Sequence, residues 1–365
     1  MARRLVYNPL VRSNRPDPGP ARTAAAGPGT AAIGSPTVSL TSPAAQHPRL
    51  NRSQLAVPGS SRRFIDKARA VPADIVMFDL EDAVAPDEKE AARRTVIEAI
   101  NGLDWGTRTL SVRINGLDTP WMYRDLIEVA EQAGARLDLI MVPKVGNAGD
   151  VYTVDVLLSQ IEAALGRPRR IGIEVLVESA LGLTHIDAIA AASDRIESLH
   201  LGPGDYCASI GARTLSIGGP HPGYGVLTDA DADGRRRMHW NDLFHYVHCR
   251  LIVAARARGL RPVDGPFADF RDREGFRAAA MRAAVLGCDG KWVIHPDQVA
   301  AANEIFTPSA DEVARARRIL EAMAGAQAAG AGAVTLDGRM IDVASIRQAE
   351  VLVRKADAIA AAAPA

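Results

Sequence analysis

The chain is poor in cysteine and in aromatic residues, and neither sign of charge is in excess. Its three cysteines, Cys207, Cys249 and Cys288, have no metal-ligand spacing and cannot all pair. They exclude a disulfide-dense secreted domain and favour a reducing, cytoplasmic location. The 43 Lys and Arg residues balance 43 Asp and Glu, which argues against a nucleic-acid-binding protein. No apolar run is long enough to cross a bilayer, so we expect no membrane association.

The sequence also lacks a G-x-G-x-x-G motif after its first apolar segment, which makes a doubly wound dinucleotide-binding sheet only the second choice of fold. Short apolar segments instead alternate regularly with longer amphipathic ones. Eight of the short segments are expected to be strands: 54–57, 75–78, 109–114, 139–142, 171–177, 198–201, 261–263 and 291–294. Because nearly all of them precede a helical pattern, the sequence predicts an α/β fold, a (β/α)8 TIM barrel.

The chain divides into three parts by composition. Residues 1–48 are rich in Pro, Ala, Gly, Ser and Thr and lack periodicity, so we expect a flexible N-terminal extension; the alternative is an organelle transit peptide. Residues 49–306 are the expected barrel, with helices at 86–100, 121–132, 151–165, 183–192, 239–258, 272–286 and 297–305. Residues 307–365 hold a helix at 309–326, a Gly/Ala hinge, a hairpin turning at Asp337-Gly338 and a helix at 343–363, which suggest a mobile C-terminal lid.

The stretch 171–206 contains two apolar strands, and each leads to a carboxylate. The first strand ends at Glu178, and the second runs into a turn that carries Asp205. Parallel barrel strands bring their carboxyl ends to one rim, where two acids can share a Mg²⁺ ion. Each acid alone has a structural reading, Glu178 at a helix N-terminus and Asp205 in a Gly-Pro-Gly turn. Their occurrence on consecutive strands favours the metal site.

Other polar residues follow expected strands and belong at the same rim. Arg113 offers a planar fork for a substrate carboxylate, or else forms a salt bridge to Glu81 or Asp82. Arg62, at a helix start after a Gly-Ser turn, either binds phosphate or lies on a solvated helix face. His295 either contacts a ligand or only caps its strand. The set is completed by Asp79, Lys144 and Asp264.

Several short motifs give the chain a resemblance to a known family. They are 55–59 (LAVPG), 79–86 (DLEDAVAP), 113–116 (RING), 142–144 (VPK), 177–180 (VESA), 208–212 (ASIGA) and 293–296 (VIHP). In this order they resemble the HpcH/HpaI aldolase superfamily, in its citrate lyase β-subunit-like branch. Longer segments are most similar to the malyl-CoA lyases of that branch: 100–106 (INGLDWG), 262–270 (PVDGPFADF) and 290–300 (GKWVIHPDQVA).

The resemblance implies specific residue roles. Glu178 and Asp205 would ligate Mg²⁺, with Mn²⁺ as the alternative ion, and Arg113 would bind the acid substrate. Asp342, in the lid, would be the catalytic acid/base and would act in the active site of a neighbouring subunit. That exchange implies a homotrimer or a homohexamer. The positions expected to contact the CoA thioester or its acyl part are Ala56, Val57, Arg62, Gly204, Asp205, Ile294 and His295.

The activity implied is a Mg²⁺-dependent carbon–carbon lyase that reversibly cleaves malyl-CoA to glyoxylate and acetyl-CoA. β-Methylmalyl-CoA, giving propionyl-CoA, is a second expected substrate if the pocket has room for a methyl group. The alternatives are a thioesterase for malyl-CoA or a related acyl-CoA, a citramalyl-CoA lyase, and a citrate lyase β-like subunit. A Schiff-base aldolase acting through Lys144 is the least favoured. Ala56 stands where malyl-CoA lyases carry a large aromatic and Arg62 where Lys is usual, which leaves the acyl preference open.

Overall fold

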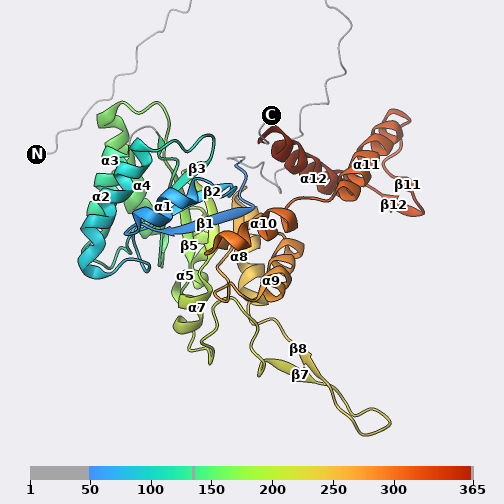
Figure 1. Ribbon diagram of the computed structural model, residues 1–365. Helices are drawn as coiled ribbons and strands as arrows, with labels where there is room; N and C mark the ends of the chain where they lie inside the picture. Colours follow the sequence, from blue (N-terminus) through green and yellow to red (C-terminus); the bar gives the residue numbers. More distant parts are fainter. Residues whose placement is uncertain (1–48, 134–135, 363–365) are drawn as a thin grey trace, which may run out of the picture. The chain divides into compact units, whose positions relative to one another are not determined.

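Eight parallel strands close into a barrel in the computed structural model of the chain (Figure 1). The structure describes residues 49–133 and 136–362, so the extension expected at 1–48 lies outside it. Around the barrel the strands follow the order β1-β10-β9-β6-β5-β4-β3-β2. Their bounds are β1 Ser53–Pro58, β2 Ile75–Asp79, β3 Thr109–Arg113, β4 Leu139–Val142, β5 Gly172–Val177, β6 Ile196–Leu201, β9 Arg261–Asp264 and β10 Gly290–Val293. The prediction of a (β/α)8 barrel is confirmed.

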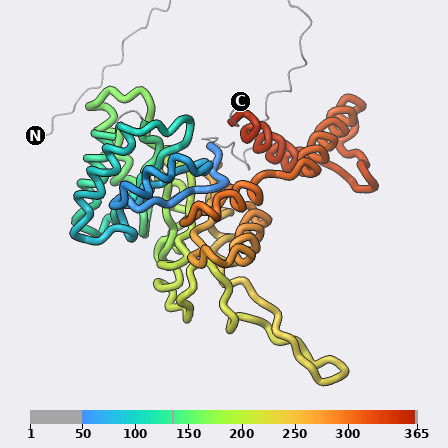
Figure 2. Tube along the Cα trace, in the orientation of Figure 1, coloured from blue at the N-terminus to red at the C-terminus, as the bar shows by residue number. Residues whose placement is uncertain are grey.

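Helices connect successive strands, as parallel pairing requires. They are α1 Arg62–Ala68, the short 3₁₀ helix η1 Pro86–Glu88, α2 Lys89–Gly102, α3 Met122–Gln132, α4 Ala148–Leu165, α5 Ala180–Thr184, α6 Ile186–Ala190, α7 Pro203–Ser209, α8 His245–Arg256 and α9 Arg273–Leu286. A further helix, α10 Pro296–Ile305, follows the last barrel strand. Figure 2 traces the chain from blue β1 to orange β10, which pair with each other and close the barrel.

Alternate residues of each strand enter two separate interiors. In β5, Ile173, Val175 and Val177 pack in the large core between the strands and the helices. Leu176 faces the other way and joins a small apolar cluster inside the barrel. This period of two is what strand geometry dictates, and it carries Glu178 to the same side as Leu176 at the strand's carboxyl end. The other buried members of the inner cluster are Met77, Met141, Val263 and Trp292.

Two predicted helices differ from the structure. The helix expected at 183–192 is broken into α5 and α6 at His185, whose Nδ1 contacts the carbonyl oxygen of Gly146 at 2.9 Å. The helix expected at 239–258 begins only at His245. The residues before it form β8 (Met238–Trp240), which pairs antiparallel with β7 (Gly225–Leu227). The start of the predicted helix forms a strand instead because it pairs with β7, a segment outside that helix.

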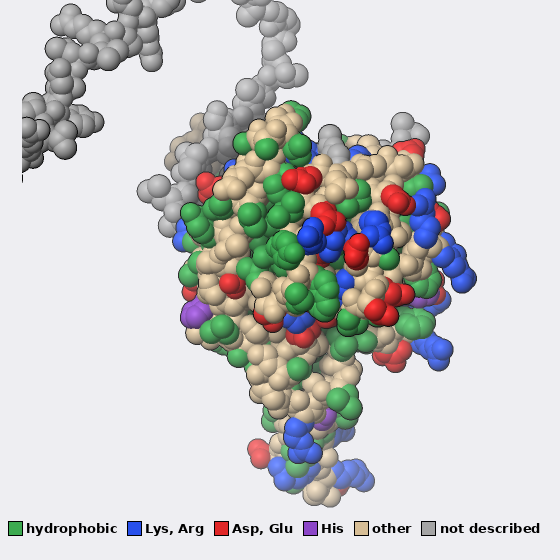
Figure 3. Space-filling view, turned by 90° about the vertical axis from the view of Figure 1, so that its left-hand side faces the viewer, with side chains coloured by type: hydrophobic (Ala, Val, Ile, Leu, Met, Phe, Trp, Pro, Cys, Tyr) green, Lys and Arg blue, Asp and Glu red, His purple; other side chains and the backbone are tan. Residues whose placement is uncertain are grey.

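The C-terminal segment matches the expected order of elements. It comprises α11 Ala310–Ala328, β11 Val334–Leu336, β12 Arg339–Ile341 and α12 Val343–Ala362. Asp337 and Gly338 both have positive φ (51° and 73°), the conformation of a type I′ hairpin turn. Within the described residues, no helix has the length and apolar character needed to span a bilayer. Figure 3 shows acidic and basic side chains mixed on the face that it displays, in keeping with the balanced composition.

Candidate active site

A cavity of about 370 Å³ opens at the carboxyl ends of the barrel strands. In barrel enzymes this is the end that carries the chemistry, because the loops after the strands converge there. The wall includes residues at or just after the carboxyl ends of β1, β2, β3, β5, β6, β9 and β10. The lining residues are Ala56, Val57, Pro58, Asp79, Asp82, Ala83, Arg113, Leu176, Glu178, Gly202, Pro203, Gly204, Asp205, Ile217, Pro266, Trp292 and Ile294.

Arg113, at the end of β3, forms ion pairs with three acids, Asp79, Glu81 and Asp82. Its Nε and Nη2 donate to the two oxygens of Asp79 at 2.7 and 2.5 Å, a bidentate pair. Its Nη1 lies 2.7 Å from Glu81 and 3.3 Å from Asp82. The salt bridges considered from the sequence are therefore present. Asp82 is the most exposed of these acids and makes the longest contact, so a substrate carboxylate can displace it most readily.

Lys144 connects this group to Glu178. Its Nζ bonds Glu81 and lies 3.4 Å from Asp82, while its backbone N–H donates to Glu178 Oε1 at 2.8 Å. Lys144 has a φ of 53°, which is unusual for a residue with a side chain and is typical of functional sites. With this backbone conformation, Lys144 contacts Glu81 and Asp82 through its side chain and Glu178 through its backbone N–H. Gly202 completes the arrangement, because a Cβ at that position would collide with the Glu178 side chain.

The charges around the cavity perturb the pKa values of its residues. Burial, together with the nearby Glu81 and Asp205, raises the pKa of Glu178 from 4.5 to about 8. Burial also raises the pKa of Glu81, although Arg113 and Lys144 oppose the shift. For Lys144 burial favours the neutral amine, but the hydrogen bond and charge of Glu81 outweigh it and raise the pKa. A charged Lys144 cannot act as the nucleophile of a Schiff-base mechanism.

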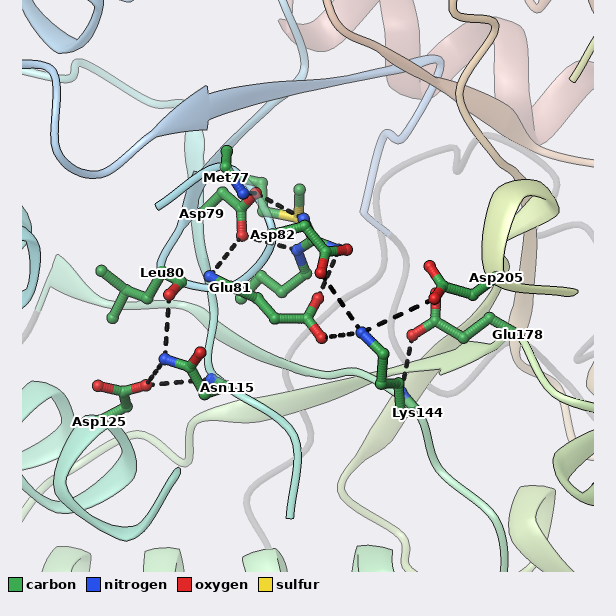
Figure 4. Close-up of polar contacts among 12 residues, drawn as sticks. Met77, Asp79, Leu80, Glu81, Asp82, Asn115, Asp125, Lys144, Glu178 and Asp205 are labelled. Atoms are coloured by element: carbon green, nitrogen blue, oxygen red, sulfur yellow. Dashed lines mark hydrogen bonds and ion pairs between the residues drawn. The ribbon is translucent and has the colours of Figure 1, made fainter. Parts of the chain in front are cut away.

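The donor set of the cavity fits a divalent cation. Five carboxylates (Asp79, Glu81, Asp82, Glu178 and Asp205) meet two cations, Arg113 and Lys144. Figure 4 shows the Glu178 and Asp205 carboxylates next to each other, on the side of Lys144. No group of three or more His, Cys, Asp or Glu with metal-binding geometry occurs in the described residues. Mg²⁺ commonly uses only one or two protein carboxylates and completes its shell with water and substrate, so the pair suffices.

Of the ten residues that the family resemblance assigns to catalysis, substrate binding or metal binding, seven line the cavity: Ala56, Val57, Arg113, Glu178, Gly204, Asp205 and Ile294. Three do not, among the residues that the structure describes. Arg62 is half exposed and pairs with Asp66 one helical turn away. His295 stacks on Phe270 and caps α10. Asp342 caps α12, accepting from the backbone N–H of Ala344 at 2.9 Å.

The lining also contains residues that the sequence reasoning did not select: Leu176, Ile217, Pro266 and Trp292. Leu176 and Trp292 had a usable signal, because each lies two residues before a rim residue and therefore on the inward face of its strand. Ile217 and Pro266 come from loops, whose course the strand pattern does not fix. Asp264, expected at the rim, is instead buried against Lys291 (2.6 Å) and His248 (2.8 Å).

Comparison with known proteins agrees with this architecture. The family model described as HpcH/HpaI aldolase/citrate lyase matches residues 52–296, from β1 through the start of α10. The chain belongs to this family. It is 53% identical over 313 residues to the L-malyl-CoA/β-methylmalyl-CoA lyase of Cereibacter sphaeroides, which covers 86% of this chain and 96% of that protein.

Two further relatives bear on the site. A (3S)-malyl-CoA thioesterase of the same species is 35% identical over 314 residues, covering 85% of this chain and 96% of that protein. The crystal structure of CitE from Mycobacterium tuberculosis, in complex with magnesium, acetoacetate and coenzyme A, is 30% identical, with a TM-score of 0.62. It covers 84% of this chain and 97% of that one. The family therefore includes both lyases and thioesterases that act on CoA esters.

Proposed function

We propose that the protein is a Mg²⁺-dependent lyase that reversibly cleaves malyl-CoA to glyoxylate and acetyl-CoA, and β-methylmalyl-CoA to glyoxylate and propionyl-CoA. The observation that carries the proposal is the pair Glu178 and Asp205 beside Arg113 in one cavity of the barrel rim. The 53% identity to a lyase of that specificity over most of both chains supports it. One methyl group in a pocket changes affinity by only about 1–3 kcal/mol, so both acyl substrates should be accepted.

In this proposal Glu178 and Asp205 hold Mg²⁺, and Mn²⁺ is expected to substitute for it. The ion, when bound, polarises the carbonyl oxygen of the oxo-acid and orients it. It also balances two of the excess negative charges of the rim. Glu178 would lose its proton on binding the ion, because the charge of the cation favours the carboxylate and offsets the burial and the neighbouring acids that raise the pKa of Glu178.

Arg113 binds the carboxylate of the oxo-acid through Nη1, replacing its long contact to Asp82. Asp79 holds the other edge of the guanidinium, so the fork keeps its direction when the substrate leaves. The same positive charge stabilises the enolate of the acyl-CoA, whose Cα–H is a very weak acid. Ala56, Val57, Gly204 and Ile294 then form the wall against which the acyl-CoA lies. Arg62 and His295 remain proposed CoA contacts on the outer surface.

Asp342 is the proposed acid/base that takes the Cα proton in condensation and returns it in cleavage. It belongs to the C-terminal segment 307–365, the proposed lid, and it does not line the cavity of its own chain among the described residues. We therefore propose a homotrimer or homohexamer in which the lid of one subunit closes the cavity of the next. A cytoplasmic location fits the three free thiols.

The first experiment separates the lyase from the thioesterase. Malyl-CoA is supplied with Mg²⁺, glyoxylate is trapped as its phenylhydrazone, and free CoA thiol is followed in parallel, with EDTA as the control. Hydrazone without free thiol, abolished by EDTA, establishes the lyase. Free thiol without hydrazone means hydrolysis, the activity of the 35% identical relative, and rejects the proposal.

Mixing two inactive variants tests the exchange of the lid. Asp342→Ala lacks the acid/base and Glu178→Gln lacks a metal ligand, so neither homo-oligomer should turn over. If Asp342 acts in the neighbouring subunit, mixed oligomers contain some sites with both groups intact and regain part of the parent activity. Unchanged inactivity of a mixture that demonstrably exchanges subunits would place Asp342 in its own site or outside catalysis.

A further inference from the structure

A polar layer lies inside the barrel, directly beneath the floor of the cavity. It consists of Gln54, Ser111, Glu174, Ser198 and His200, whose side chains are all completely buried. Barrel interiors are normally filled by layers of apolar, branched side chains. A buried carboxylate is costly unless its oxygens are hydrogen-bonded, and nothing in the proposed reaction uses Glu174 directly. We therefore expect this polar layer to have a role other than direct participation in the reaction.

Four polar side chains whose contacts with the Glu174 carboxylate are 2.5–3.4 Å long can each donate a hydrogen bond to it. Ser111 Oγ lies 2.5 Å and Gln54 Nε2 2.9 Å from its Oε2. Ser198 Oγ and His200 Nε2 lie 3.4 and 3.3 Å from its Oε1. An ionised carboxylate only accepts hydrogen bonds, so it makes each of these neighbours a donor. His200 consequently carries a proton on Nε2, shared between Glu174 and Ser198 Oγ at 2.8 Å.

The contact of the other ring nitrogen, Nδ1, independently indicates the same tautomer of His200. Trp292 Nε1 lies 2.8 Å from His200 Nδ1, and an indole N–H can only donate. His200 Nδ1 must therefore be unprotonated. Glu174 at one end and Trp292 at the other thus select a single form of His200, the neutral ring with its proton on Nε2. The donors run in one direction, from Trp292 through His200 to Glu174.

This series of hydrogen bonds, the hydrogen-bond chain, reaches the active-site cavity at Trp292. Trp292 is part of the cavity lining, and the guanidinium of Arg113 lies over its ring at 5.5 Å. We infer that Glu174 and His200 are positioning residues that fix the indole of Trp292 as the floor of the cavity and, through it, the direction of Arg113. Binding of the oxo-acid should therefore depend on the hydrogen-bond chain, whereas binding of acyl-CoA should not. The identity of that acid rests on the proposed function.

The test compares two replacements of His200. His200→Asn keeps an acceptor near the position of Nδ1, whereas His200→Leu removes it at similar size. One net hydrogen bond corresponds to a change of up to about tenfold in an equilibrium constant. We therefore expect His200→Leu to raise the KM for glyoxylate by about tenfold, with kcat and the KM for acetyl-CoA little changed, and His200→Asn to recover most of the loss.

Val175→Ala is the matched control for a general loss of stability. Val175 is also fully buried in the barrel wall, but it faces the helices and not the interior. It should lower the melting temperature without changing the KM for glyoxylate. An equal rise of that KM in Val175→Ala and His200→Leu would overturn the positioning role.

Nitrogen NMR of the substrate-free parent protein tests the hydrogen-bond chain independently of catalysis. We expect the ¹⁵N shifts of His200 to show an unprotonated Nδ1 and a protonated Nε2, and the Trp292 indole proton to move upfield in His200→Leu. A proton on Nδ1 of His200 would overturn the inference even in an active lyase. Conversely, a parent enzyme without lyase activity would reject the proposed function, while the nitrogen shifts would still support or overturn the hydrogen-bond chain.

Discussion

Replacing Glu178 by Gln should stabilise the metal-free protein while abolishing its response to Mg²⁺. Glu178 is almost fully buried and lies among acids, so its pKa rises from 4.5 to about 8. A raised carboxyl pKa leaves the fold unaffected below about pH 4.5 and destabilises it increasingly up to pH 8, because the unfolded chain ionises freely and the folded one does not. At pH 7 this difference is worth about 3 kcal/mol, at 1.36 kcal/mol per pKa unit.

Gln has the shape of the protonated acid and can still accept from the Lys144 N–H, so it avoids that cost. In EDTA at pH 7 the variant should melt about 5 °C higher than the parent, with the gap closing towards pH 4.5. Mg²⁺ should raise the melting temperature of the parent, since an ion that binds only the folded state stabilises it, and should leave that of the variant unchanged. Thermal melts at several pH values, with EDTA or Mg²⁺, provide the measurement.

Glu162→Gln is the matched control. Glu162 is also a buried glutamate, but Arg195 neutralises it through contacts of 2.7 and 3.0 Å. Its replacement should lower the melting temperature at neutral pH and leave the Mg²⁺ response intact. A Glu178→Gln protein that melts below the parent in EDTA, or that Mg²⁺ still stabilises, would refute the electrostatic reasoning.

Three other predictions concern residues outside the metal pair. Asp342→Ala should lower kcat at least 100-fold, the lower range for loss of general acid–base catalysis, while calorimetry shows nearly normal binding of Mg²⁺ and CoA; lost CoA affinity with unchanged kcat would contradict its role. Burial opposes ionisation of Asp264, but Lys291 and His248 outweigh it and hold its pKa well below the usual range. The stability that Asp264 contributes is therefore present above about pH 3.9 and is lost as the pH falls further, and Asp264→Asn should cost about 3–5 kcal/mol in urea unfolding at pH 7. Borohydride added during turnover should leave no mass adduct on Lys144, whose amine stays charged beside Glu81; an adduct there would reopen the Schiff-base mechanism.

The candidate site was predictable where a residue's role depends on its place along a strand. Glu178 and Asp205 follow consecutive parallel strands, so their meeting at one rim follows from chain geometry. Arg113 and its partner Asp79 follow from the same reasoning applied to β2 and β3. The strand period places Trp292 on the inward face of β10, but the same pattern occurs whether an inward residue fills the barrel core or lines a cavity.

Predictions from the local sequence pattern were wrong where contacts with another segment decide the structure. Residues 239 and 240 fit a helical pattern but belong to β8, which pairs with β7 across a long turn, and the helix starts only at His245. Arg62 follows a turn after β1 and His295 follows β10, yet their side chains contact Asp66 and Phe270. The direction of a side chain at the rim depends on its neighbours, which the linear sequence does not identify.

The sequence by itself determined the alternation of strands and helices, the position of the acids after the strands and the family to which the chain belongs. These follow from hydrophobic periodicity and motif order, which are properties of short segments. Only the tertiary structure decided which of those residues share a cavity, that the backbone of Lys144 has a positive φ, and that a hydrogen-bond chain runs from Glu174 through His200 to Trp292. Such features depend on the register between strands far apart in the chain, and closure of the barrel sets that register for all eight strands together.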